Sequence, residues 1–195
     1  MPLDDRSPDS TAAAYSQGGR AWAAGPTRIY ARLAELLVAA SPVSLTERLV
    51  CDVGAGTGVA SRAAAAAGAA VIATDIAPGM LTVDRSDRPP AVVADATSLP
   101  FADAAFGGVV AAYCYNHLDD PAAGFREARR VTAAGGVVLA SAYADDDAHP
   151  VKAATEQALR EIGWTAPEFH LELRGDIAER GKRRANRHFR DSGPI

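Results

Sequence analysis

A glycine-rich segment after a short apolar run constrains the fold more than any other part of this chain. The segment is residues 49–58, Leu-Val-Cys-Asp-Val-Gly-Ala-Gly-Thr-Gly, and an alanine-rich stretch that suits a helix follows at 60–67. An apolar run, a glycine turn and a helix make up the first unit of an open α/β sheet. Glycines in such a turn permit positive φ and let a ligand approach the backbone. The segment therefore predicts an α/β fold with a ligand at this turn.

The spacing of the glycines and the acid before them indicate the kind of ligand. Gly54, Gly56 and Gly58 form a G-x-G-x-G pattern, whereas dinucleotide-binding turns have G-x-G-x-x-G. Asp52 stands at the carboxyl end of the predicted strand, where its charge would repel a pyrophosphate seated at the helix N-terminus. The same carboxylate can accept hydrogen bonds from an ammonium group. These features favour a nucleoside that carries an amino acid over a dinucleotide.

Two further acids end predicted strands. Residues 70–76 form a buried-strand pattern that ends in Asp75, 21 residues after Gly54, and residues 91–96 form another that ends in Asp95. An acid at about this interval reaches ribose hydroxyls in nucleotide-binding folds. Because the carboxyl ends of parallel strands share one edge of the sheet, we expect the three acids Asp52, Asp75 and Asp95 to lie along one ligand site.

These segments resemble the class I S-adenosylmethionine-dependent methyltransferases, and the chain is similar to the small-molecule branch that includes ubiquinone and menaquinone methyltransferases. The resemblance runs from about residue 15 to about residue 165, and the matching motifs stand in order. They are Val-Cys-Asp-Val-Gly-Ala-Gly-Thr-Gly, Ala-Thr-Asp-Ile-Ala-Pro-Gly-Met-Leu, Ala-Asp-Ala-Thr-Ser-Leu-Pro-Phe, Asn-His-Leu-Asp-Asp-Pro and Glu-Ala-Arg-Arg-Val-Thr-Ala-Ala-Gly-Gly. The resemblance implies S-adenosyl-L-methionine as cofactor and a Rossmann-like, doubly wound, mostly parallel sheet with helices on both faces.

The resemblance also assigns cofactor contacts to particular positions. Asp75 would bind the ribose hydroxyls, or alternatively cap the helix that follows it. Ile76 and Met80 would pack near the adenine, or belong to the core. Asp95 would accept a hydrogen bond from the adenine amine, with the backbone N–H of Ala96 donating nearby, or else cap its own loop.

The acceptor side of the site is expected after the fourth strand, around Tyr113. His117 is the candidate general base, because its unperturbed pKa lies near neutrality. Methyl transfer needs alignment of acceptor, methyl and sulfur, and a base is needed most for a hydroxyl or carbon acid. Tyr15 lies in an N-terminal segment that folds over the cofactor in this family, where Trp22 and Tyr30 could line the same pocket.

Composition limits the remaining possibilities. The net charge of −4 is mild, no apolar run is long enough for a membrane span, and the N-terminus lacks the pattern of a signal peptide. Cys51 and Cys114 are too few for a disulfide framework. His149 and His170 have no partners at metal-ligand spacing, so no metal is expected. We therefore expect a cytoplasmic protein without nucleic-acid or membrane partners.

The predicted organisation has three parts. Residues 1–14 form a disordered arm, 15–174 the cofactor-binding domain, and 175–195 a polar, basic tail. The resembled fold ends in an antiparallel hairpin of two strands, but only 168–174 alternates like a strand, so this hairpin is incomplete. That segment should cover its own sheet edge or pair with a second copy of the chain as a homodimer.

The strands are expected at about 48–53, 70–75, 91–95, 107–113 and 137–142, and the helices at about 28–40, 57–67, 77–84, 121–131 and 149–162.

Methyl transfer to an O-, N- or C-centred small molecule, such as a secondary metabolite or a quinone-like compound, is the function that this sequence favours. An NAD-dependent Rossmann dehydrogenase is disfavoured by the glycine spacing and because no Tyr is followed four residues later by Lys. A catalytically impaired cofactor-binding subunit remains the alternative that is not an enzyme.

Overall fold

The computed structural model describes residues 8–143, 154, 157–158, 161 and 163 of the 195. The chain divides into two compact units after Ala142, and the predicted site belongs to the first, which is described below. Most of the helix expected at 149–162 lies outside the described residues. So do the strand-like segment 168–174, the terminal hairpin and the tail 175–195.

Five strands of residues 8–143 form one sheet in the order β3-β2-β1-β4-β5, and every neighbouring pair is parallel. The strands are β1 (Leu49–Val53), β2 (Ala70–Asp75), β3 (Ala91–Val93), β4 (Phe106–Ala112) and β5 (Thr132–Ser141). From β1 the chain continues to one side through β2 and β3, and then returns to the other side as β4. A crevice at the carboxyl ends of the strands forms at such a switch point. The predicted doubly wound parallel sheet is confirmed.

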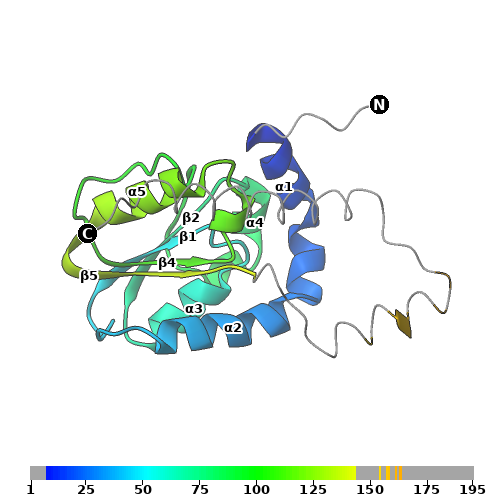
Figure 1. Ribbon diagram of the computed structural model, residues 1–195, viewed down its shortest axis with the longest axis horizontal. Helices are drawn as coiled ribbons and strands as arrows, with labels where there is room; N and C mark the ends of the chain where they lie inside the picture. Colours follow the sequence, from blue (N-terminus) through cyan, green and yellow to red (C-terminus); the bar gives the residue numbers. More distant parts are fainter. Residues whose placement is uncertain (1–7, 144–153, 155–156, 159–160, 162, 164–195) are drawn as a thin grey trace, which may run out of the picture. The chain divides into compact units, whose positions relative to one another are not determined.

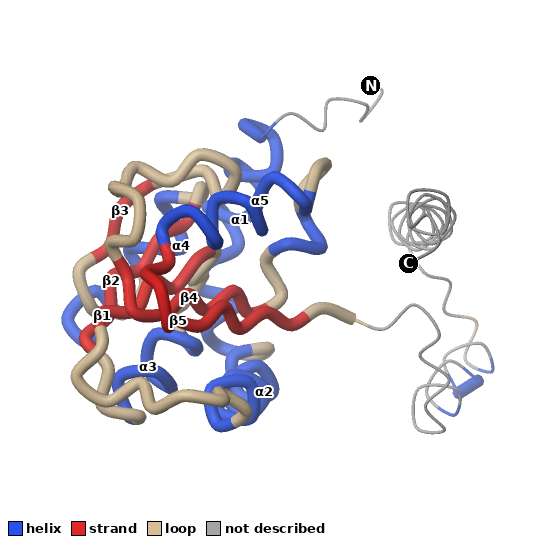
Figure 2. Tube along the Cα trace, turned by 60° about the vertical axis from the view of Figure 1, so that its left-hand side comes forward, coloured by secondary structure: helices blue, strands red, loops and turns tan. Residues whose placement is uncertain are grey.

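Helices cover both faces of this sheet, as Figures 1 and 2 show. The α-helices are α1 (Pro8–Ala24), α2 (Thr27–Ala39), α3 (Val59–Ala66), α4 (Pro78–Thr82) and α5 (Pro121–Val131), and the 3₁₀ turns are η1 (Arg85–Asp87) and η2 (Tyr115–His117). One apolar core joins α5 to the sheet through Ala128, Val131 and Phe106. The other joins α2 and α3 to the opposite face through Val38, Ala64 and neighbouring residues.

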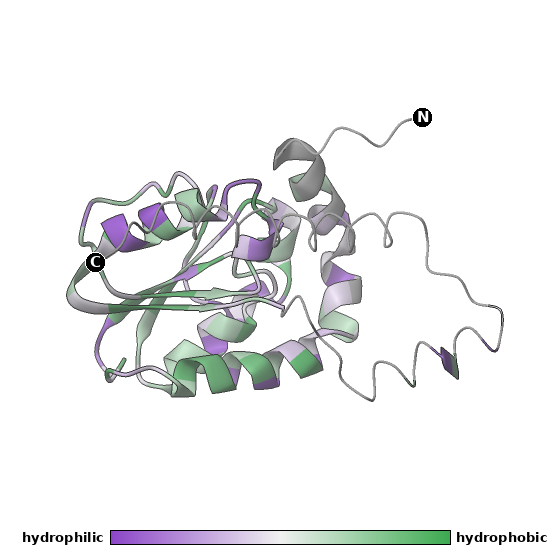
Figure 3. Ribbon diagram, viewed as in Figure 1, coloured by the Kyte–Doolittle hydropathy of each residue, from purple (hydrophilic) through white to green (hydrophobic). Residues whose placement is uncertain are grey.

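Local sequence explains why these elements form where they do. The β1 and β4 strands place valines in both cores, and Figure 3 shows hydrophobic strands beside a more hydrophilic α5. Pro121 opens α5, and the Asp120 carboxylate caps it by accepting a hydrogen bond from the Ala122 N–H at 3.0 Å. Among the helices that the structure describes, none is both long and apolar enough to cross a membrane.

Three expectations are corrected. Helix α1 begins at Pro8, so residues 8–14 are helical where we expected a disordered arm; they precede the part of the same helix that contacts α4 at Ser16. Strand β5 begins at Thr132, directly after α5 and five residues before the start that we expected at about residue 137. The reason is that Thr132 pairs with Phe106 across a register shift. Helix α4 ends at Thr82, and at Asp84 (φ 48°) the backbone leaves the helical region.

Candidate cofactor-binding site

The glycine turn after β1 has the backbone conformation that its sequence predicts. Gly54, Gly56 and Gly58 have φ values of 67°, 52° and 82°. A Cβ on Gly54 would lie 2.7 Å from the Cβ of Cys114 and would clash with its sulfur, so glycine is required there for space as well as conformation. The turn therefore holds its backbone against the segment after β4, at the carboxyl edge of the sheet.

Asp52 is a buried carboxylate at this edge, with one oxygen unsatisfied. The residue is 1% exposed, and its Oδ2 accepts a hydrogen bond from the Ser61 hydroxyl at 2.5 Å. Its Oδ1 is buried without a hydrogen-bond partner among the residues that the structure describes. Burial raises the pKa of Asp52 to about 6, because desolvation outweighs the bonds from Ser61. An unpaired buried carboxylate oxygen is costly unless a ligand with a hydrogen-bond donor satisfies it.

Asp75 ends β2 and binds the glycine turn directly. Its two carboxylate oxygens accept hydrogen bonds from the N–H groups of Gly56 and Ala77, each at 2.8 Å. Burial raises the pKa of this carboxyl, while the two backbone bonds oppose the rise. The carboxylate therefore organises the turn and the start of α4, and its remaining lone pairs can still accept bonds from a ligand.

Helix α1 packs against α4 beside these acids. The Ser16 hydroxyl accepts a hydrogen bond from the Gly79 N–H at 3.2 Å. A side chain at Gly79 would collide with the Ser16 backbone, so the two helices touch at main-chain distance. Between them lies a cavity of about 220 Å³ lined by Tyr15, Gly18, Trp22 and Met80. The methyl end of Met80 also faces Gly56, which places this cavity next to the glycine turn.

Aromatic side chains connect α1 to the segment after β4. The Tyr15 hydroxyl lies 3.4 Å from Nε2 of His117, and their ring centroids are 5.6 Å apart. Trp22 contacts Tyr15 and Tyr30, and Tyr30 meets Tyr113 edge-on at 5.3 Å. Burial lowers the pKa of His117, against a smaller opposing effect of Asp75. The imidazole is therefore mostly neutral near pH 7 and able to accept a proton.

Tyr113 follows β4 with a φ of 54°, an uncommon conformation for a residue with a large side chain. Its N–H donates to the Ser141 carbonyl at 3.0 Å, which fixes the backbone between β4 and β5. Strained positions of this kind concentrate at functional sites.

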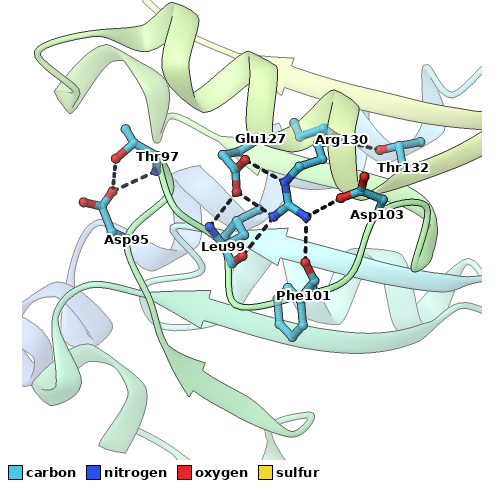
Figure 4. Close-up of polar contacts among 9 residues, drawn as sticks. Asp95, Thr97, Leu99, Phe101, Asp103, Glu127, Arg130 and Thr132 are labelled. Atoms are coloured by element: carbon cyan, nitrogen blue, oxygen red, sulfur yellow. Dashed lines mark hydrogen bonds and ion pairs between the residues drawn. The ribbon is translucent and has the colours of Figure 1, made fainter.

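Asp95 and Ala96 follow β3, one strand further along the same edge. One Asp95 oxygen accepts bonds from both the N–H and the hydroxyl of Thr97, at 2.7 and 2.8 Å. Figure 4 shows that Glu127 and Arg130 of α5 hold the rest of this loop. Glu127 accepts the Leu99 N–H at 2.8 Å, and Arg130 donates to backbone carbonyls of the same loop. The Asp95 side chain therefore forms an Asx turn within this loop. This is the contact that we gave as the alternative to adenine binding.

The structure brings most of the predicted residues together. The contacts described above gather five of them around the glycine turn: Asp52, Asp75, Met80, Tyr15 and His117. Ile76 directly follows β2 and is half-buried, and Ala96 packs in the core beneath α5. No cluster of three or more His, Cys, Asp or Glu side chains among the described residues could hold a metal.

Sequence reasoning missed two residues at this site. Ser61, the donor to Asp52, lies in the first turn of α3, where a small polar residue gives no distinctive signal. The Arg88 guanidinium lies against the glycine turn and donates to the Gly56 carbonyl at 2.7 Å. Arg88 belongs to the irregular segment after α4, and its sequence position does not reveal that the chain returns to the turn.

The comparisons with known proteins agree with this geometry. A family model described as a methyltransferase domain matches residues 51–140. The chain carries a class I S-adenosylmethionine-dependent methyltransferase domain. It is 33% identical over 157 residues to the demethylmenaquinone methyltransferase of Renibacterium salmoninarum, a match that covers 79% of this chain and 65% of the relative. It is 35% identical over 128 residues to that of Mycolicibacterium gilvum, covering 66% of this chain and 54% of the relative.

The chain thus spans between one half and two thirds of the length of these relatives. A crystal structure of a putative S-adenosyl-L-methionine-dependent methyltransferase from Methanococcus maripaludis shares the fold. Its TM-score is 0.60 at 19% identity, over 99% of this chain and 87% of the other.

S-adenosyl-L-methionine is the cofactor of this domain class, and the residues present fit it. The buried, unpaired Oδ1 of Asp52 suits the ammonium group of the cofactor's methionine part. The positive φ values of Gly54, Gly56 and Gly58 turn the backbone at the carboxyl edge of the sheet, next to this carboxylate.

Proposed function

We propose that this chain transfers the methyl group of S-adenosyl-L-methionine to a small-molecule acceptor. The observation that carries the proposal is the buried Asp52 carboxylate next to the glycine turn, whose Oδ1 has no hydrogen-bond partner among the described residues. A cation with N–H donors is the partner that such an oxygen lacks, and it would offset the cost of burying the charge. Bound S-adenosyl-L-methionine supplies an electrophilic methyl group on a sulfonium sulfur.

Each residue along the strand edge then has a role toward the cofactor. Asp52 holds the ammonium group, and Asp75 accepts bonds from the ribose hydroxyls while it keeps the turn in place. Asp95 and the N–H of Ala96 meet the adenine edge, with Ile76 and Met80 against its face. The short backbone segment at Gly54, Gly56 and Gly58 borders the cofactor, and Tyr113 borders the end that carries the methyl.

We propose an aromatic, quinol-like acceptor on the α1 side. The rings of Tyr15, Trp22, Tyr30 and Tyr113 form a chain of edge-on and tilted contacts that ends at His117. Such rings pack well against a planar acceptor. The relatives named demethylmenaquinone methyltransferases support this class. His117 would accept the proton of an acceptor hydroxyl or carbon acid, since its lowered pKa keeps the imidazole neutral near pH 7.

A turnover assay tests this proposal. The full chain would be incubated with S-adenosyl-L-methionine and a short-chain demethylmenaquinol, a catechol or a small amine, and S-adenosylhomocysteine and methylated product would be quantified by mass spectrometry. We expect product with the quinol and loss of product in Asp52→Asn. Cofactor binding without turnover on any acceptor would instead favour a non-catalytic binding subunit.

We also propose that the protein acts in the cytoplasm, without nucleic-acid partners, as a homodimer. The two unpaired cysteines, Cys51 and Cys114, suit a reducing compartment. The mild net charge gives little attraction for nucleic acid. The dimer proposal rests on the strand-like pattern at 168–174, and light scattering over a concentration series tests it.

A further inference from the structure

Arg88 reaches the glycine turn because α4 is short. The helix ends at Thr82, the backbone reverses at Asp84 with φ 48°, and after η1 the chain is extended at Arg88. This path brings the half-buried guanidinium beside Gly58, where a Cβ would lie 3.4 Å from its Nη2. The Arg88 side chain therefore lies directly beside the glycine turn.

The guanidinium joins the turn to α4. Its Nη2 donates to the Gly56 carbonyl at 2.7 Å, and its Nη1 donates to the Met80 carbonyl at 2.6 Å. Gly56 is the residue whose N–H binds Asp75, and Met80 lines the cavity beneath α1. One side chain thus fixes the two backbone segments on which the candidate cofactor contacts depend.

The charge of Arg88 also acts on the two strand-end acids. Burial raises the pKa of both Asp52 and Asp75, and the charge of Arg88 opposes that rise. Burial lowers the pKa of Arg88 itself, and the two carboxylates oppose that change. Two carboxylates at one edge of the sheet, of which Asp52 is buried and Asp75 partly buried, repel each other, so an opposing charge favours their ionised forms. The other titratable groups that interact with these three are Tyr15, Arg62, Asp84, Cys51, Cys114 and His117.

We propose that Arg88 is a positioning residue that braces the glycine turn against α4 and so prepares the turn for cofactor binding. The part that concerns the cofactor rests on the proposed function. The bracing part concerns the free protein and stands without it.

Arg62 offers a matched control on the same turn. Its Nη1 donates to the Thr57 carbonyl at 3.0 Å, one residue along from the carbonyl that Arg88 binds. Arg62 is exposed on α3, so solvent competes for this bond and screens its charge. Arg62→Gln therefore removes a guanidinium–carbonyl bond to the turn without removing a half-buried cation.

The test compares Arg88→Gln, Arg88→Lys and Arg62→Gln with wild type, in the full chain. Amide hydrogen exchange of residues 55–58 is measured without ligand, and the S-adenosylhomocysteine dissociation constant is measured by calorimetry from pH 5 to 8. In Arg88→Gln we expect exchange faster by about tenfold and affinity weaker by about tenfold or more. The pH below which binding is lost should rise, because both acids then ionise less readily.

Arg88→Lys separates the bracing from the effect of the charge. It keeps the cation but not the fork that reaches two carbonyls, so the pH dependence should stay near that of wild type while exchange at the turn accelerates. If Arg88→Gln does not fold, Arg88→Lys alone tests the bracing. Unchanged hydrogen exchange of residues 55–58 in Arg88→Lys would then overturn it. Equal effects of Arg62→Gln and Arg88→Gln would also overturn the proposal. Failure of wild type to bind S-adenosylhomocysteine would refute the proposed function, while the exchange data still test the brace.

Discussion

Replacing Asp52 by asparagine should stabilise the free protein and weaken cofactor binding at the same time. The carboxamide would keep the size of the side chain and an oxygen for the Ser61 hydroxyl, but the substitution would remove a charge that is fully buried. A rise in the pKa of Asp52 from 3.8 to about 6 corresponds to about 3 kcal/mol of unfavourable interaction of the ionised form above pH 6. The weaker neutral bond to Ser61 offsets about 1 kcal/mol of this.

The net gain of about 1–2 kcal/mol should raise the melting temperature of Asp52→Asn by roughly 2–8 °C at pH 8, measured by calorimetric unfolding without ligand. The sign of the pH dependence follows from the raised pKa. Between about pH 4 and 6 the native state binds more protons at Asp52 than the unfolded chain does, so Asp52 makes the stability of wild type fall as pH rises through this window. Asp52→Asn should lack this contribution.

S-adenosylhomocysteine, which has the same ammonium group, should stabilise wild type and have little effect on Asp52→Asn. Asp87→Asn, a change of an exposed acid on η1, controls for the loss of a negative charge in general. An Asp52→Asn protein that melts below wild type at pH 8 and still binds S-adenosylhomocysteine equally well would refute this reasoning.

Two further predictions concern the acids and the base. Asp75→Ala should weaken S-adenosylhomocysteine binding by about tenfold or more, because it removes charge-assisted bonds of roughly 1.5–3 kcal/mol in total. If calorimetry shows unchanged affinity while circular dichroism shows an intact fold, the role of Asp75 is limited to its hydrogen bonds with Gly56 and Ala77. His117→Ala should lower turnover by about 10²–10⁴ with little change in cofactor affinity, whereas Tyr15→Phe, which keeps the ring, should cost far less. A loss of turnover below about fivefold in His117→Ala would mean that catalysis depends on positioning of the acceptor and not on a base. The activity of wild type should fall as the pH drops through the lowered pKa of His117, because the protonated imidazole cannot accept a proton.

The sheet and its acid edge could be predicted because their signals are local. Apolar runs that end in Asp52 and Asp75 mark strand ends, and the three closely spaced glycines after the first run mark a turn with positive φ. The order of elements then fixes a parallel sheet through the handedness of its crossovers.

Features that depend on distant contacts could not be predicted. Helix α1 is weakly amphipathic, and its packing depends on Gly79 of α4, which no local pattern around Ser16 indicates. The early start of β5 depends on the pairing of Thr132 with Phe106. The contact of Arg88 with the glycine turn follows a backbone reversal at Asp84, after a helix shorter than we expected.

The most direct test of the account is calorimetric titration of the full chain with S-adenosylhomocysteine and, separately, with NAD. The unpaired oxygen of Asp52 and the G-x-G-x-G turn predict saturable binding of one S-adenosylhomocysteine per chain and no heat of binding with NAD. Binding of NAD with comparable affinity, or no binding of S-adenosylhomocysteine to folded protein, would contradict the central claim that this edge of the sheet holds an amino-acid-bearing nucleoside.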